Sequence, residues 1–158
     1  MAKMTRGVQA LEQAGVAFTL HPYTLAEEAD NYGEAVAAAL GVPSERLFKT
    51  LLAAVDGTPV VAIVPVSGRL GMKALARAAG AKKADMVAPT DAERITGYVT
   101  GGISPFGQRK RLSTFVDDSM LAHGTIYCSA GQRGLQVEVA PEDLIRLLDA
   151  TTAPLAEN

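Results

Sequence analysis

Apolar and polar residues alternate along several short segments, a pattern typical of β-strands that bury one face. Residues 17–23 alternate in this way, and Pro22, which has no amide proton for a strand ladder, places them at a sheet edge or a strand end. Residues 47–55 and the nearly all-apolar residues 60–66 flank the turn Asp56-Gly57, so they predict a hairpin whose second strand is buried. Three later segments are also predicted as strands: residues 114–116, 125–129 and 135–139.

Helical periodicity and end signals predict five helices, several of them followed by a glycine that can adopt the left-handed conformation of a helix end. These helices are residues 8–14, 33–40, 72–79, 90–95 and a final one that begins at Pro141. Residues 98–107 are predicted as a short strand that runs into a glycine-rich turn, acidic residues 26–30 as a loop, and the tail after Thr151 as frayed. Strands and helices are mixed rather than strictly alternating, so residues 1–158 are predicted to form a single α+β domain with a mixed, strongly curved sheet.

Composition excludes several classes of protein. Of 158 residues, 48% are hydrophobic and 20% charged, which excludes a disordered or fibrous chain. The formal net charge of -2 argues against a protein that coats nucleic acid, although a local basic patch stays open. One cysteine excludes an internal disulfide, and with two histidines a Cys/His zinc site is excluded too. No apolar run approaches the roughly 20 residues of a membrane span and no signal-peptide core is present, so a cytoplasmic protein is expected.

Gly101-Gly102-Ile103-Ser104-Pro105 is the most informative local motif. Two glycines allow backbone conformations that other residues avoid, and they expose consecutive N–H groups that can bind an anion or a developing oxyanion. The alternative is a tight turn between strands, and spacing alone favours that interpretation.

Lys49 lies inside an apolar segment, where strand alternation puts it on the same face as Leu47 and Leu51. A lysine among apolar neighbours either faces water at a sheet edge or serves as a functional cation in a pocket. The residue pattern leaves both interpretations open.

Other reactive or charged residues have structural explanations. The basic run 108–111 is either a solvated loop or a phosphate-contacting patch, which further cations extend if they converge on it: Arg69, Lys82, Lys83 and Arg133. Cys128 is expected to be a small buried strand residue rather than a nucleophile. His21 and His123 have no serine or cysteine partner in a recognisable triad, so surface or structural roles are expected.

Five stretches, in the same order and spacing, resemble one known family. They are residues 48–52, 79–83, 96–111, 125–129 and 131–135. Together they are similar to the YbaK/EbsC aminoacyl-tRNA deacylases, free-standing relatives of the editing domain of bacterial prolyl-tRNA synthetases. The likeness spans nearly the whole chain, and the subgroup that it resembles is the Cys-tRNA(Pro) deacylases.

The resemblance implies a mixed, barrel-like sheet surrounded by helices, and an enzyme without a metal or other cofactor. It implies hydrolysis of cysteine that prolyl-tRNA synthetase has attached to proline tRNA, with aminoacylated tRNA and that synthetase as partners. The family's functional lysine corresponds to Lys49, and its Gly-x-x-x-Pro turn to Gly101, Gly102, Ile103, Ser104 and Pro105. The pocket positions correspond to Tyr23, Tyr32, Thr50 and Ser129. Gln136 stands where a close relative has Asp, so it keeps a carbonyl acceptor for the substrate's amine but loses the charge.

The implied mechanism needs no protein nucleophile, because an aminoacyl ester is already activated. The substrate's own cysteine thiol, of which roughly a few per cent is thiolate at neutral pH, attacks its carbonyl and gives a cyclic thiolactone and free tRNA. We expect backbone N–H groups of Gly101 to Ile103 to stabilise the oxyanion, and Lys49 to bind the terminal nucleotide. Two alternatives stay open: water-mediated deacylation of another mischarged tRNA, such as Ala-tRNA(Pro), and a non-catalytic module that binds a tRNA end or the synthetase.

Overall fold

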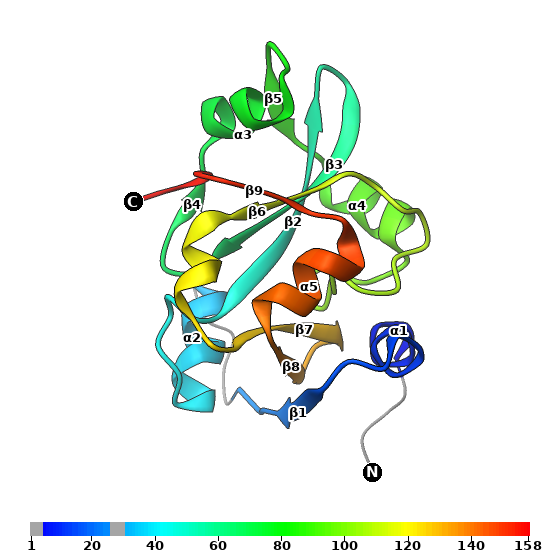
Figure 1. Cartoon of the computed structure of the whole chain (residues 1–158), viewed down its shortest axis with the longest axis vertical. Coiled ribbons are helices and arrows are strands. Elements are labelled where there is room, and N and C mark those ends of the chain that lie inside the picture. The colour runs from blue at the N-terminus through cyan, green and yellow to red at the C-terminus, as the bar shows by residue number, and fades with distance from the viewer. Residues whose placement is uncertain (1–4, 26–30) are drawn as a thin grey trace.

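A five-stranded and a three-stranded sheet form the body of the protein (Figure 1). The computed structural model describes residues 5–25 and 31–158, so the loop predicted at 26–30 lies outside the described residues. The five-stranded sheet contains, in spatial order, β5 (Ala84–Met86), β2 (Phe48–Val55), β3 (Thr58–Pro65), β6 (Thr114–Asp117) and β9 (Thr151–Ala153). The three-stranded sheet contains β1 (Phe18–Pro22), β8 (Leu135–Val139) and β7 (Ile126–Gln132), and a two-stranded ribbon pairs β10 (Ala156–Glu157) with β4 (Arg69–Leu70).

The β2–β3 hairpin is the longest paired unit and confirms the prediction from the sequence. Its antiparallel register runs without a break from Phe48↔Pro65 to Val55↔Thr58. Asp56 (φ 47°) and Gly57 (φ 84°) both have positive φ, as a two-residue type I′ hairpin turn requires. β3 is buried over its last six residues, because Val61 and Ile63 pack into one core cluster and Val60, Ala62 and Val64 into another on the opposite face.

The sheets do not close into a barrel, which corrects the single barrel-like sheet expected from the sequence. Contact between the five- and three-stranded sheets is made where β2 begins: Leu47 forms one parallel bridge with Tyr127, and the Tyr127 N–H donates to the Arg46 carbonyl at 3.1 Å. The register of β7 against β8 then shifts between Ser129 and Gln132, which bends β7. The α+β class is confirmed, with mixed parallel and antiparallel pairing.

Five α-helices and one 3-10 helix among the described residues cover the sheets: α1 (Arg6–Ala14), α2 (Tyr32–Leu40), α3 (Met72–Ala79), α4 (Pro89–Thr96), η1 (Asp118–Ala122) and α5 (Pro141–Leu148). The Asn31 side chain caps α2 by accepting from the Glu34 N–H, and α1 to α4 each end at a glycine in the left-handed conformation. The five α-helices lie within two residues of their predicted positions, because these end signals act locally.

Three predictions about local structure are wrong. The three residues of β5 were not predicted as a strand, and residues 98–100 form no strand. The tail is ordered rather than frayed: β9 pairs with β6, and Leu155 is fully buried. The Asp117 carboxylate accepts hydrogen bonds from the N–H groups of Leu155 and Ala156, each at 2.8 Å. These contacts come from distant parts of the chain, so no local pattern could reveal them.

The core is divided among three clusters of buried side chains. The largest packs the inner face of the three-stranded sheet against β2, β3 and α1, and includes Leu11, Phe48 and Val137. Within residues 5–25 and 31–158, no helix combines the length and apolar character needed to cross a membrane.

Candidate functional site

A cavity of about 910 Å³ opens beside the first half of β2. It is lined by residues 47–52, the end of β1, the start of α2, the β5–α4 connection, the glycine turn and the β7–β8 hairpin. Its size is in the range of sites that hold a small molecule or a cofactor. Five other segments of the chain therefore meet around the apolar strand that carries Lys49.

Eight of the eleven residues selected from the sequence line this cavity: Tyr23, Tyr32, Lys49, Thr50, Gly101, Ile103, Ser129 and Gln136. The other three are not brought to it. A Cβ on Gly102 would lie 2.9 Å from the backbone of Gln132 and Arg133, so this glycine packs against the β7–β8 connection. Ser104 is fully buried and its Oγ accepts the Phe106 N–H, while Pro105 lines a separate depression of about 190 Å³.

The described lining of the cavity carries positive charge. It includes Lys49 and Arg133 but no aspartate or glutamate. Burial lowers the pKa of Lys49, an effect that Glu34 partly opposes, and Lys49 makes no ion pair with any described residue. A half-buried ammonium group without a carboxylate partner is suited to binding an anion such as a phosphate.

Two buried polar atoms in the cavity wall have no hydrogen-bond partner in the described part of the chain. They are Thr50 Oγ1 and Gln136 Oε1, on side chains from different sheets. Thr50 is 8% exposed and Gln136 5% exposed, so bulk water does not readily satisfy them. Leaving such an atom unpaired costs about 1–3 kcal/mol, so these two atoms are candidate contacts for water or a ligand that enters the cavity.

Two tyrosines and an arginine form the side of the cavity next to α2. The hydroxyls of Tyr23 and Tyr32 lie 2.6 Å apart, and the Arg133 guanidinium lies 5.5 Å from the Tyr32 ring centre. Burial, with the hydrogen bond to Tyr23, raises the pKa of Tyr32, so its phenol stays neutral. Arg133 was expected from the sequence only as an extension of a basic patch, although it lies within the recognised stretch 131–135.

The remaining cations of that hypothetical patch do not line the cavity: Arg69, Lys82, Lys83, Arg109, Lys110 and Arg111. Sequence analysis also missed the apolar wall contributed by Met86, Val87, Pro89 and Ala92. No signal marked these four as functional, because apolar residues at the end of a short strand and the start of a helix look like ordinary packing positions.

The glycine turn presents backbone N–H groups with different partners. Gly102 N–H donates to the Val99 carbonyl at 2.9 Å and is committed to the turn itself. Gly101 and Ile103 line the cavity, and neither N–H has an acceptor among the described residues. Of the three donors expected from the sequence, these two are therefore free to face a ligand.

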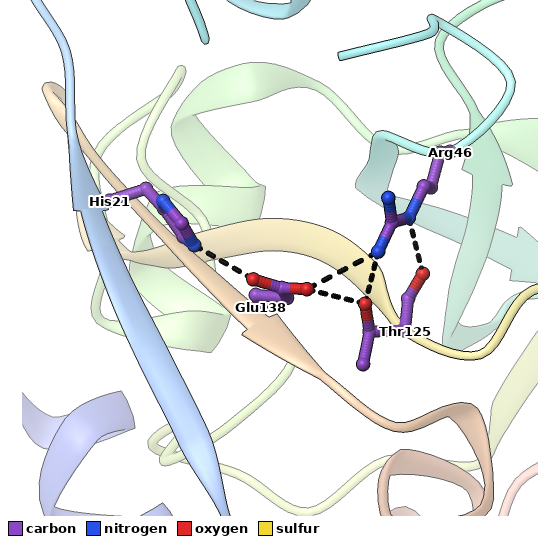
Figure 2. Close-up of polar contacts among 4 residues, drawn as sticks. All are labelled: His21, Arg46, Thr125 and Glu138. Atoms are coloured by element: carbon purple, nitrogen blue, oxygen red, sulfur yellow. Dashed lines mark hydrogen bonds and ion pairs between the residues drawn. The ribbon is translucent and has the colours of Figure 1, made fainter. Parts of the chain in front are cut away.

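Cys128 and His21 lie outside the cavity lining. Cys128 is fully buried, and burial raises the pKa of its thiol to about 12, as expected for a packing residue. Figure 2 shows the side chain of His21 directed at Glu138, which Arg46 and Thr125 also contact. In the described chain, no group of three or more histidine, cysteine, aspartate or glutamate side chains could hold a metal ion.

Solved structures share this fold. One, described as a "putative trans-editing enzyme for prolyl tRNA synthetase", superposes with a TM-score of 0.85 over 97% of this chain and 96% of that chain, at 21% identity. The hypothetical protein APE2540 also superposes with a TM-score of 0.85, over 97% of this chain and all of that one, at 22% identity. At such low identity, these structures establish the fold alone.

Sequence comparison goes further. The chain is 36% identical over 152 residues to an Enterococcus faecalis protein named "Putative Cys-tRNA(Pro)/Cys-tRNA(Cys) deacylase EbsC", covering 96% of this chain and 92% of that protein. It is also 36% identical over 87 residues to the proline--tRNA ligase of Nitratidesulfovibrio vulgaris, although this match covers only 15% of the ligase. Residues 26–147 match the model of the aminoacyl-tRNA editing domain, and the chain belongs to that family.

Proposed function

We propose that this protein deacylates Cys-tRNA(Pro), by cleaving the ester that joins cysteine to proline tRNA, and that Cys-tRNA(Cys) is a second substrate. The observation that carries the proposal is the pair of unpartnered buried atoms, Thr50 Oγ1 and Gln136 Oε1, in a cavity beside Lys49. Membership of the editing family supports an aminoacyl ester as the ligand. The name of the Enterococcus faecalis relative supports cysteine as its amino acid.

The lining residues support a division of the cavity between the two ends of the ester. Gln136 Oε1 is a neutral acceptor suited to the substrate's α-amine, and Thr50 Oγ1 can donate or accept beside it. The Lys49 ammonium is suited to a phosphate of the terminal nucleotide of the tRNA. The volume of about 910 Å³ exceeds what an amino acid fills, which favours entry of the terminal nucleoside together with its aminoacyl group.

The proposed chemistry uses the thiol of the substrate. Its sulfur attacks the carbonyl carbon of the same cysteine, the ester C–O bond breaks, and the ribose oxygen takes up the proton as the thiolactone leaves. The described lining has no histidine, cysteine, aspartate or glutamate that could activate the Ser129 or Thr50 hydroxyl or a water molecule, which favours this route. Gly101 and Ile103 N–H groups are the proposed donors to the oxyanion, where one such donor contributes about 3 kcal/mol.

The partners follow from the substrate. A domain with a net charge of -2 has little basic surface for reading a whole tRNA, so we propose that prolyl-tRNA synthetase supplies the tRNA selectivity. The match to proline--tRNA ligases supports a shared substrate.

The test is release of amino acid from four substrates: Cys-, Ala-, Ser- and Pro-tRNA(Pro). Thiol-dependent deacylation predicts release of cysteine alone, and loss of release when the thiol is methylated. Release of alanine or serine at a comparable rate would favour attack by water. Binding of all four tRNAs without release would identify a non-catalytic module.

A further inference from the structure

Two charged side chains from separate elements hold the backbone of Thr100. Its N–H donates to Glu93 Oε2, on α4, at 2.7 Å. Its carbonyl accepts from Arg133 Nε, at the β7–β8 turn, at 3.0 Å. Hydrogen bonds to charged groups are shorter and stronger than those between neutral groups, so both polar atoms of this residue are firmly anchored. Consistent with this, the hydrogen bond from Thr100 lowers the pKa of Glu93.

The residues around Thr100 form a type II β-turn. Gly102 N–H donates to the Val99 carbonyl at 2.9 Å and closes the turn. Gly101, in the third position, has φ +88°, while Thr100 in the second position has no positive φ. This combination defines type II, which differs from the commoner type I by a flip of the central peptide. Here the central peptide joins Thr100 to Gly101.

Anchoring the carbonyl also fixes the neighbouring N–H. In a planar trans peptide, the Thr100 carbonyl and the Gly101 N–H point to opposite sides. In the flipped peptide, the Gly101 N–H would face the Arg133 guanidinium, so that two donors would meet. The contact is close, since a Cβ on Gly101 would lie 2.6 Å from Arg133 Nε. Arg133 is itself oriented by its position over the Tyr32 ring.

We propose that Arg133 and Glu93 are positioning residues: Arg133 holds the Thr100–Gly101 peptide in its type II orientation, and Glu93 holds the preceding Val99–Thr100 peptide. Together they keep the Gly101 N–H available to the reacting ester. The proposal rests on the proposed function, in which this N–H stabilises the oxyanion. It explains why Arg133, which lines the cavity, donates its Nε–H to a backbone carbonyl. It also links α4 and the β7–β8 hairpin to the chemistry through the two peptides that flank Thr100.

The first experiment measures the peptide orientation without any substrate. In NMR spectra, a type II turn gives a strong NOE between Thr100 Hα and Gly101 HN, whereas type I gives a strong one between the two amide protons. We expect the wild-type chain to show the first pattern, and Arg133→Met and Glu93→Met to show part of the second. Arg77→Met and Glu12→Met, which replace exposed side chains on other helices, should leave it unchanged. An unaltered type II pattern in both turn variants would overturn the proposal.

The second experiment follows deacylation of Cys-tRNA(Pro). Because loss of an oxyanion donor costs about a hundredfold or more, partial loss of its orientation should lower kcat by about tenfold in each variant, with KM within about twofold. Glu93→Gln, which keeps an acceptor oxygen, should restore most of the turnover. The double variant should lose little more than either single variant, because both residues act through the orientation of the same Gly101 N–H. Losses that multiply, or a rise in KM alone, would contradict the positioning role. A wild-type chain inactive on all four tRNAs would overturn the proposed function, and the NOE pattern would still decide the orientation.

Discussion

Gln136 and Glu138 lie on the same face of β8, two residues apart, but they differ in how many hydrogen bonds their side-chain oxygens make. Glu138 accepts from Thr125 Oγ1 at 2.5 Å and from Arg46 Nη2 at 3.2 Å, and lies 2.9 Å from His21 Nε2 (Figure 2). Gln136 Oε1 has no partner among the described residues, although it is the more deeply buried. A polar group whose partners are all supplied by the protein stabilises the fold. One left without a partner destabilises it, and is retained where a ligand completes it.

The same contrast separates two cations near the start of β2. Arg46 donates from Nε to the Thr125 carbonyl at 2.7 Å, and its guanidinium lies 5.1 Å from the Tyr127 ring centre. Lys49, three residues later, has a lowered pKa and no ion pair in the described chain. We call Arg46, His21, Thr125 and Glu138 the Glu138 network. Substitutions in this network should change stability, and substitutions in the cavity should change activity.

The largest expected effect is on activity, from Lys49→Met. Loss of the cavity's ammonium removes the anchor for the terminal nucleotide, and we expect turnover of Cys-tRNA(Pro) to fall by about a hundredfold or more. Thermal stability should hold or rise, because an unpaired, half-buried charge is replaced by an apolar chain of similar length. Lys73→Met, at an exposed position of α3, is the matched control for both measurements. Near-normal turnover would make Lys49 an ordinary strand lysine.

Glu138→Ala should lower stability and leave activity nearly unchanged, the reverse of Lys49→Met. It leaves Arg46, His21 and Thr125 without their shared acceptor, and we expect unfolding free energy to fall by about 2 kcal/mol. Turnover per folded molecule should stay within about twofold of wild type, with the exposed Glu12→Ala as control. Denaturant titration and single-turnover kinetics on the same samples give both numbers. A loss of turnover without a loss of stability would place Glu138 in the site instead.

The destabilisation by Glu138→Ala should also depend on pH. The hydrogen bond from Thr125, followed by His21 and Arg46, lowers the pKa of Glu138 in the folded chain. A depressed carboxylate pKa adds stability above its unfolded value, about 4.3, and this stability is lost as pH falls through the folded value. The difference in unfolding free energy between wild type and variant should therefore be constant near neutral pH and shrink below about pH 4. A difference that grows on acidification would contradict this sign.

Gln136→Met should lower activity by about tenfold, less than Lys49→Met, because one neutral hydrogen bond to the substrate's amine is lost. Stability should be unchanged or up to about 1 kcal/mol higher, since an unpaired buried carbonyl is replaced by an apolar group of similar shape. Gln136→Glu is the companion variant, because its carboxylate supplies two acceptor oxygens and a negative charge. Loss of stability in Gln136→Met with unaltered turnover would assign Gln136 to the fold.

The smallest effect on activity is expected from Cys128→Ser. Cys128 is fully buried in the core, with a thiol pKa of about 12, so turnover should remain within about threefold of wild type. Stability should fall by about 1 kcal/mol or more, because a hydroxyl is placed among apolar side chains. A loss of several orders of magnitude in turnover of the folded variant would overturn the mechanism that relies on the substrate's thiol.

Local sequence signals determined much of this fold. The Asp56-Gly57 turn between two apolar segments specified the β2–β3 hairpin, and the glycines after α1 to α4 specified where these helices end. Such signals succeed because turn and cap conformations depend on a few neighbouring residues. The resemblance to the family also identified eight of the residues that line the cavity. Both kinds of information are contained in short stretches of the chain.

Only the tertiary structure decided which polar atoms have hydrogen-bond partners, and which strands pair with the short segments that have weak sequence signals. Strand β9 forms because it pairs with the edge of β6. Asp117 fixes the start of β10 by accepting the N–H groups of Leu155 and Ala156. Arg133 and Glu93 meet at Thr100 although 40 positions separate them, and Glu138 but not Gln136 finds hydrogen-bond partners among the described residues. Hydrogen bonding and burial depend on neighbours in space, so residue type and spacing alone could not distinguish a group that stabilises the fold from one that awaits a ligand.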